Sequence, residues 1–422
     1  MARSPLKGER GCALALVLLA ALPARAQQTD SCIECHTEQD PPLSTPVKLL
    51  AGDVHGEAHL SCADCHGGDR SLEDVKAHRS EGYVGRPKAL EVATMCGRCH
   101  SDIEKMRGFD PRLPTDQQAK YLTSQHGKLA AQGDLNAATC VSCHGAHGIK
   151  RPSDPDSKVS PLHVVETCSG CHADPVRMKP YGIPTNQLEA YEKSVHGHAR
   201  LVERDTGAPA CNTCHGSHGL VPAGLASVFD ACGKCHETQA ELFAASTHAK
   251  AFAEKHARKE IASPSCSACH AAHEIQRPSD AALGGPLCAS CHAPGDKCDR
   301  AANAMKGALE ELGSDIAAAE AELGLAESLG MEVAEGHVQL AAAREALVRS
   351  RVVVHAFAKA RLDASVEEGR KATRAVMKAS EAALAEHRTR RRGLAVASLC
   401  LLAFATLLAL KARRIAKESA PI

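Results

Sequence analysis

The sequence lacks tryptophan altogether and holds few other aromatic residues, with four Tyr and six Phe among 422 residues. A folded region of this length ordinarily needs more large apolar side chains to fill its core. The chain also lacks a net charge, because 50 Lys and Arg balance 50 Asp and Glu. Without a basic excess there is no case for nucleic-acid binding. Something other than aromatic side chains must supply much of the apolar bulk.

Cysteine and histidine are abundant instead, with 21 and 24 residues. Eighteen of the cysteines form nine Cys-x-x-Cys-His motifs, which we call sites 1 to 9 in chain order. The motif residues are Cys32, Cys35 and His36; Cys62, Cys65 and His66; Cys96, Cys99 and His100; Cys140, Cys143 and His144; Cys168, Cys171 and His172; Cys211, Cys214 and His215; Cys232, Cys235 and His236; Cys266, Cys269 and His270; Cys288, Cys291 and His292.

This motif is the attachment signature of haem c, in which two thiols hold the porphyrin and the His is the proximal ligand of the iron. Zinc ribbons and disulfide scaffolds also use Cys-x-x-Cys pairs, but neither needs a His directly after the second Cys. All nine motifs have it. The sequence therefore predicts nine covalent haem c groups, and their porphyrins would supply the missing apolar bulk. At about 29 residues per motif, each haem must touch another.

The motifs belong to a larger internal repeat. After the lone site 1, the other eight motifs form four units of two. Units 2 to 4 share a Ser-x-His, a first motif, a further His three residues after the motif's own His, and a second motif. Unit 1, which holds sites 2 and 3, is degenerate: it has Asp53 in place of the Ser, and Asp69 in place of the post-motif His.

A second His on an iron gives a closed, low-spin site suited to electron transfer, whereas an open position permits substrate chemistry. The post-motif histidines should reach a neighbouring haem, because the proximal His is only three residues away. If one haem is open, we expect it in the degenerate unit. The repeated positions predict the distal ligands His55, His126, His147, His196, His218, His248 and His273, with His59, His78 and His163 as further candidates, and with His198 and His256 interpreted as surface residues.

Two apolar runs indicate export and membrane attachment. Residues 1–26 have the basic start, short apolar run and Ala-Arg-Ala end of a secretory signal peptide, although an uncleaved anchor is the alternative. Residues 393–410 are uncharged and fit the lower limit for a membrane-spanning helix, with a buried soluble helix as the alternative. We expect a protein of the cytoplasmic membrane, with the haem domain (27–296) in the periplasm and the tail (411–422) in the cytoplasm.

Residues 297–392 are rich in Ala, Glu, Leu, Arg and Lys and contain no Pro, which predicts long helices. An apolar stripe runs from Leu309 to Leu323, and Gly324 and Gly330 are candidate breaks, so we expect a hairpin with a turn near Gly330. Its apolar face must pack on the hairpin partner, on the haem domain or on a second subunit. A stalk, a cap on the haem domain and a homo-oligomer contact all stay open.

The repeated unit, Ser-x-His-Gly followed by Cys-x-x-Cys-His-Gly-x-His-Gly and a second motif, resembles the doubled-motif multihaem cytochromes c. It is similar to the group that holds tetrahaem electron-transfer cytochromes, pentahaem nitrite reductases and octahaem hydroxylamine oxidoreductases. The resemblance covers about residues 30 to 295 and implies bis-His haems stacked in close parallel and perpendicular pairs. One departure is that nitrite reductases have Lys as the proximal ligand of their catalytic haem, whereas no motif here ends in Lys.

These observations predict a mainly α fold with much irregular loop, wrapped around a haem stack and followed by long helices and one transmembrane helix. The first functional hypothesis is a membrane-anchored electron carrier, with redox proteins or membrane quinol as partners. The alternatives are a reductase or oxidase of a small nitrogen or sulfur compound at one open haem, and a quinol-oxidising membrane cytochrome. A haem-bearing scaffold inside a larger complex is the structural alternative.

Overall fold

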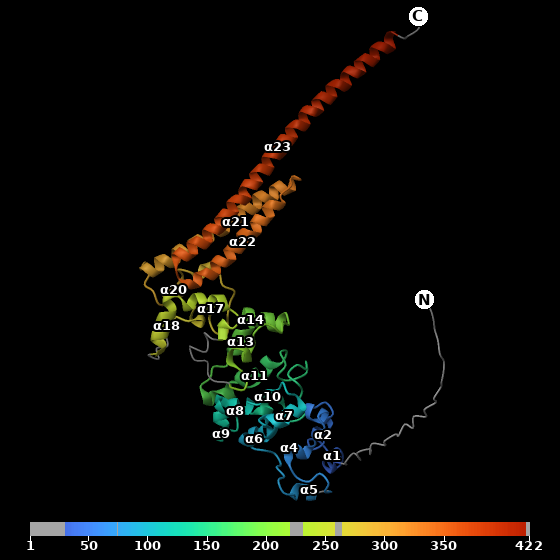
Figure 1. Ribbon diagram of the computed structural model, residues 1–422, viewed down its shortest axis with the longest axis vertical. Coiled ribbons are helices and arrows are strands. Elements are labelled where there is room, and N and C mark those ends of the chain that lie inside the picture. Colours follow the sequence, from blue (N-terminus) through green and yellow to red (C-terminus); the bar gives the residue numbers. More distant parts are fainter. Residues whose placement is uncertain (1–29, 74, 220–230, 258–263, 419–422) are drawn as a thin grey trace, which may run out of the picture.

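A computed structural model describes residues 30–73, 75–219, 231–257 and 264–418. The chain is elongated, with short helices and loops at one end and long helices at the other (Figure 1). The expected signal peptide, residues 1–26, lies outside the described residues. The expected fold class is confirmed, because the described residues contain helices and loops without a strand.

The haem domain contains mostly short helices in chain order, so that α1 and α5 lie at one end and α17 to α20 at the other (Figure 1). The longest of them, α6, has 12 residues. The helices are α1 Ser31–Thr37, α2 Thr45–Leu50, α3 Val54–Glu57, α4 Cys62–His66, α5 Val75–Arg79, α6 Ala89–His100, α7 Ile103–Phe109, α8 Gln117–Thr123, α9 Gln125–Ala131, α10 Cys140–His144, α11 Val164–His172, α12 Pro175–Met178, η1 Lys179–Tyr181, α13 Gln187–Glu192, α14 Val195–Gly197, η2 His198–Val202, α15 Cys211–His215, α17 Glu237–Ala244, α18 Thr247–Ala257, α19 Cys266–His270, η3 Asp280–Ala282 and α20 Pro286–Ala289.

Three long helices follow: α21 (Lys297–Ser328), α22 (Ala334–Val353) and α23 (Lys359–Glu418), with the short turn η4 (Val354–Ala356) between the last two. They form a bundle whose core is the largest among the described residues and includes fully buried Leu residues from α21 and α23. The chain reverses after α21 at Gly330, whose φ of 74° suits glycine. Gly324 does not break its helix. The apolar stripe therefore packs within one chain.

The bundle follows the haem domain in the chain and also packs against the last part of it, so it caps that end of the domain. Arg351 of α22 forms a two-pronged ion pair with Asp280, with nitrogen–oxygen distances of 2.9 and 2.8 Å. Phe357 contacts Phe243 of α17 edge to face, at a ring-centroid distance of 6.5 Å. Leu283, beside η3, packs against the bundle core. These contacts fix the turn η4 relative to the haem domain.

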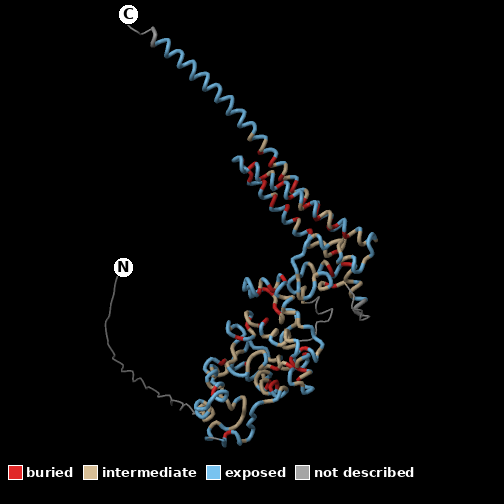
Figure 2. The backbone as a smooth tube through the Cα atoms, turned by 180° about the vertical axis from the view of Figure 1, so that it is seen from behind, coloured by how far each residue is buried: buried red, intermediate tan, exposed pale blue. Residues whose placement is uncertain are grey.

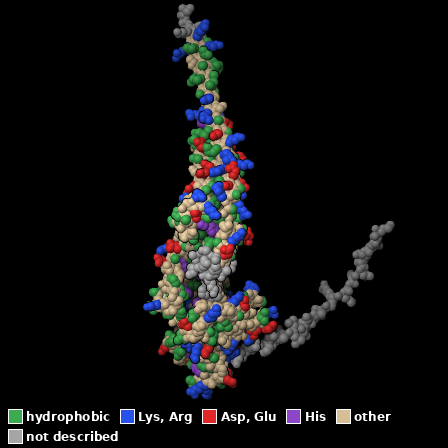
Figure 3. Space-filling view, turned by 90° about the vertical axis from the view of Figure 1, so that its left-hand side faces the viewer, with side chains coloured by type: hydrophobic (Ala, Val, Ile, Leu, Met, Phe, Trp, Pro, Cys, Tyr) green, Lys and Arg blue, Asp and Glu red, His purple; other side chains and the backbone are tan. Residues whose placement is uncertain are grey.

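Helix α23 runs without a break from the bundle into the C-terminal apolar run. Among the described residues it is the one helix long and apolar enough to cross a membrane, and its most apolar window has a mean hydropathy of 2.4 with no residue buried. Figure 2 shows this outer half of α23 exposed on all sides. Figure 3 shows an apolar stretch there with Lys and Arg at both ends. The helix is a candidate membrane anchor.

Candidate functional site: nine histidine pairs

The first motif of each unit forms a single helical turn, as in α4, α10, α15 and α19. Residues three or four apart in a helix share a face. The two cysteines of a motif therefore point to the same side, and the His, four residues after the first Cys, lies next to that Cys. Polar residues cap these turns: the backbone N–H of Ser61 donates to Asp64, and that of Thr139 donates to the hydroxyl of Ser142. The second motifs of units 1 and 2 instead end the longer helices α6 and α11.

The Ser-x-His-Gly segment begins a helix that presents its His inward. In unit 2 the Ser124 hydroxyl donates to the carbonyl of Tyr121 and accepts from the N–H of Gly127. A Cβ atom on Gly127 would collide with the Tyr121 carbonyl oxygen, so glycine is required for this close approach. Unit 3 repeats these contacts with Ser194, Tyr191 and Gly197. The sequence repeat thus encodes one local structure.

Each of the nine motif histidines faces one other histidine at nearly the same distance. The ring centroids are 5.9 to 6.3 Å apart. Two metal–nitrogen bonds of about 2 Å, with about 1 Å from each nitrogen to its ring centre, would place the rings about 6 Å apart. The spacing therefore fits an iron between the rings. The pairs, sites 1 to 9 in order, are His36–His78, His66–His147, His100–His55, His144–His218, His172–His126, His215–His273, His236–His196, His270–His355 and His292–His248.

The pairs follow a register along the repeat. The Ser-x-His residue of a unit faces the second motif of the same unit, as His196 faces His236. The post-motif His of a unit faces the first motif of the preceding unit, as His218 faces His144. No unit precedes unit 1, and the His of site 1 already faces His78. A His in place of Asp69 would therefore have no motif His to face. Both motif histidines of unit 1, the unit in which we would expect an open haem if there were one, have a facing ring.

The last pair of this register reaches outside the haem domain. Site 8 is the first motif of the last unit, so no further unit can supply a post-motif His. Its His270 instead faces His355 of η4, at 6.1 Å between ring centroids and 24° between ring planes. His355 is not among the ligands predicted from the sequence, which all lie between the first and the last motif. The signal was available, since the register leaves one first motif without a following unit.

Two of the further distal candidates, His59 and His163, and the predicted surface residue His198 lie outside these pairs. In the described part of the chain every motif His already has a facing ring, and His59 is exposed. His163 lies 3.4 Å from Glu166, and His198 lies 3.2 Å from Glu203 with its side chain 59% exposed. The side chain of His256 lies outside the described residues. His78, which the repeat did not select, is the ring opposite His36.

The ring nitrogens and burial suit metal binding. Nδ1 of His66 lies 3.0 Å from the carbonyl oxygen of Val84, and Nδ1 of His355 lies 2.9 Å from that of Val352, which leaves Nε2 for a metal. Burial lowers the pKa of His126, with the facing His172 as a second cause. A neutral imidazole is the form that binds a metal ion.

The thiols of consecutive sites are neighbours at every step along the chain. A hydrogen bond from the thiol of the preceding site lowers the pKa of Cys140, Cys211 and Cys266, each to about 7. At the other steps the thiols are close enough for their charges to interact. The neighbouring pairs are Cys32–Cys62, Cys65–Cys99, Cys96–Cys140, Cys143–Cys171, Cys168–Cys211, Cys214–Cys232, Cys232–Cys266 and Cys269–Cys288. The attachment points thus form one row in sequence order.

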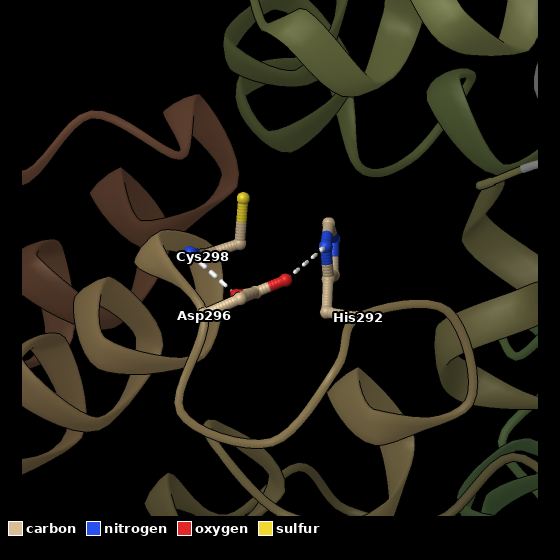
Figure 4. A group of neighbouring side chains, drawn as sticks. All are labelled: His292, Asp296 and Cys298. Carbon is tan, nitrogen blue, oxygen red and sulfur yellow. Dashed lines mark hydrogen bonds and ion pairs between the residues drawn. The ribbon is translucent and has the colours of Figure 1, made fainter.

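Site 9 has an acidic neighbour at the start of the bundle. Asp296 caps α21, accepting from the backbone N–H groups of Cys298 and Asp299 at 2.7 and 2.8 Å. Its other oxygen points at Nδ1 of His292 from 3.9 Å (Figure 4). Donor atoms of His292, Asp296 and Cys298 lie within 4.8 Å of one another, but His292 already faces His248. The cluster therefore belongs to site 9.

Comparison with known proteins gives one match in the haem domain. The family model for cytochrome c3 matches residues 202–293, which hold sites 6 to 9. No curated protein and no solved structure matches the chain. The matched residues include the pairs His215–His273 and His292–His248 in full. It supports a multihaem cytochrome c with covalently bound haem.

Proposed function

We propose that the protein is a membrane-anchored cytochrome in which nine bis-His haems conduct electrons along the haem domain in chain order. The observation that carries the proposal is the row of nine motifs, each with a second His about 6 Å from its own. Haem c bound in this way supplies reversible one-electron chemistry at a closed iron. The protein attaches each group, orients its two imidazoles and holds neighbouring attachment points together.

A relay is favoured over a reductase or oxidase, because the proposed ligands occupy both faces of every site. A substrate-binding haem needs an open position. The degenerate unit 1 is the candidate for one by sequence, yet His66 faces His147 and His100 faces His55. Among the described residues every motif His has a facing His, so the proposed ligands leave no iron position open to a substrate.

The geometry of α23 favours a protein donor over membrane quinol. With the apolar run in the bilayer, 34 residues of continuous helix separate Lys359 from the membrane at Gly393, which is about 50 Å at 1.5 Å per residue. His355 of site 8 lies just before α23, and so at the opposite end of that helix from the apolar run. With the haem domain in the periplasm, we propose that a water-soluble redox domain exchanges electrons with sites 8 and 9, and that a second partner does so near site 1.

Injection of electrons at one end tests the relay. Lys297, exposed beside site 9, is changed to Cys in a Cys12→Ser, Cys298→Ser, Cys400→Ser background, and a photosensitiser is attached to this single thiol outside the motifs. Repeated flashes should reduce all nine haems in the parent. With Cys211→Ala and Cys214→Ala, which remove site 6, rapid reduction should stop after sites 7 to 9.

The matched control removes site 1 by Cys32→Ala and Cys35→Ala, and all eight remaining haems should still be reduced rapidly. Mass spectrometry must show eight haems in both variants. If the site 6 variant reduces all its haems as fast as the site 1 variant does, a relay in chain order is refuted.

A further inference from the structure

Asp53 stands at a position where the other three units carry Ser, and it makes contacts that a Ser does not make there. One oxygen of its carboxylate accepts from the backbone N–H of His55 at 2.8 Å and lies 3.0 Å from Nδ1 of the same residue. The other oxygen accepts from the backbone N–H of Ile149 at 2.9 Å. Asp53 is only 4% exposed. It is therefore a buried carboxylate bound directly to a ring of site 3.

The corresponding serines bind the backbone instead. In unit 3 the Ser194 hydroxyl donates to Tyr191 and accepts from Gly197, and does not bind the ring of His196. The surrounding backbone is otherwise alike: Val54 donates to the carbonyl of Ile149 at 2.8 Å, and Val195 donates to that of Ile275 at 2.8 Å. Units 1 and 3 thus form an internal comparison in which the capping side chain differs.

The carboxylate contact sets site 3 apart chemically. Among the paired rings in the described ranges, His55 is the one whose Nδ1 has a carboxylate within hydrogen-bond distance. Where other paired rings use Nδ1, the partner is a neutral carbonyl, as for His66 and His355. Asp296 is 3.9 Å from His292, too far for such a bond. A carboxylate partner makes an imidazole a stronger electron donor to its metal.

We infer that Asp53 is a positioning residue that lowers the reduction potential of site 3 through its bond to Nδ1 of His55. This inference rests on the proposed haem occupancy of the histidine pairs. The oxidised iron carries one more positive charge than the reduced iron, so a more basic ligand and a nearby carboxylate both favour the oxidised state. Site 3 then stays oxidised at potentials where it would otherwise accept an electron.

The test compares Asp53→Ser, Asp53→Asn and Ser194→Asp in the full-length protein loaded with haem. Asp53→Ser gives unit 1 the residue that units 2 to 4 carry at this position, and Asp53→Asn keeps an acceptor oxygen while removing the charge. In a spectroelectrochemical titration of the nine haems, both variants should raise the reduction potential of one component. At a fixed potential its ratio of reduced to oxidised form should rise at least tenfold, which is about 59 mV for one electron. Ser194→Asp should move a different component downward.

Haem count and spin state separate this inference from the proposed function. Nine low-spin haems with an unchanged titration in both Asp53 variants would overturn the tuning role and leave the relay intact. If Asp53→Ser creates a high-spin haem, the titration of Asp53→Asn is used in its place. Nine low-spin haems and an unshifted titration in Asp53→Asn would again refute the tuning role. Fewer than nine haems in the unaltered protein would instead contradict the proposed function.

Discussion

His355 in the turn before the membrane-directed helix faces His270 of the last haem-binding unit, with ring centroids 6.1 Å apart and ring planes 24° apart. The turn η4 is held against the haem domain by Phe357 and by the Arg351–Asp280 ion pair. Because the partner of His270 comes from the bundle, the helices are more than a stalk. They complete a site that the haem domain cannot complete alone.

Replacement of His355 should therefore open one site. His355→Ala should convert one haem from low spin to high spin and let it bind carbon monoxide when reduced, because an iron that loses an imidazole becomes accessible to small ligands. Optical and electron paramagnetic resonance spectra measure both effects. His337→Ala is the matched control, since His337 lies in α22 with its side chain 50% exposed beside Glu327. A low-spin His355→Ala protein would contradict the assignment.

Truncation should separate anchoring from ligation. A chain that ends before Gly393 should be released from membranes with nine low-spin haems, because it loses the apolar run and keeps the bundle. A chain that ends before Lys297 should also be released, but with one high-spin haem at site 8. Fractionation and spin quantification measure the two properties. If the longer truncation still sediments with membranes, α23 is not the anchor.

The repeat predicts much of this site, and the residues it fails to predict have a physical reason. The shared position predicts His126, His196 and His248 as ligands, and each faces a motif His of its own unit. His78 and His355 occupy non-repeated positions, because site 1 has no unit before it and site 8 has none after it. A pattern identifies what recurs, whereas the ends of a repeat array are completed by tertiary contacts.

The fold shows the same division. Composition and an apolar stripe predict long helices, since both are local properties of the chain. They do not tell whether the stripe packs on a hairpin, on the haem domain or on another subunit. The structure has a three-helix bundle within one chain, and its contact with the haem domain depends on pairs as distant as Asp280 and Arg351.

The bundle core should be sensitive to large-to-small substitution. Leu362 of α23 is fully buried, so Leu362→Ala should lower the free energy of unfolding of the bundle by about 2 to 5 kcal/mol. The loss of helical circular dichroism on heating measures the effect. Val348→Ala is the control, because Val348 is 59% exposed, and it should change stability by no more than about 0.5 kcal/mol. Equal destabilisation of the two variants would contradict the packing described here.

The relative orientation of the paired rings predicts distinct magnetic signatures. At sites 2, 4, 6 and 8 the planes of the two rings in a pair differ by 2 to 24°. At sites 1, 3 and 9 they differ by 76 to 83°. Sites 5 and 7 are intermediate, at 49 and 36°. Near-parallel imidazoles split the iron d orbitals and give rhombic low-spin spectra, and crossed imidazoles give strongly anisotropic ones. Electron paramagnetic resonance should therefore resolve both rhombic and strongly anisotropic low-spin signals. A single type of low-spin signal would contradict the two ring orientations.

Nine bound haems, each between two histidines, are the basis of the proposed relay. Their most direct test is spin quantification of the oxidised full-length protein, combined with mass spectrometry of the same sample. The account predicts nine covalent haem additions and nine low-spin ferric centres without a high-spin signal. Fewer than nine haems, or any high-spin centre, would contradict it.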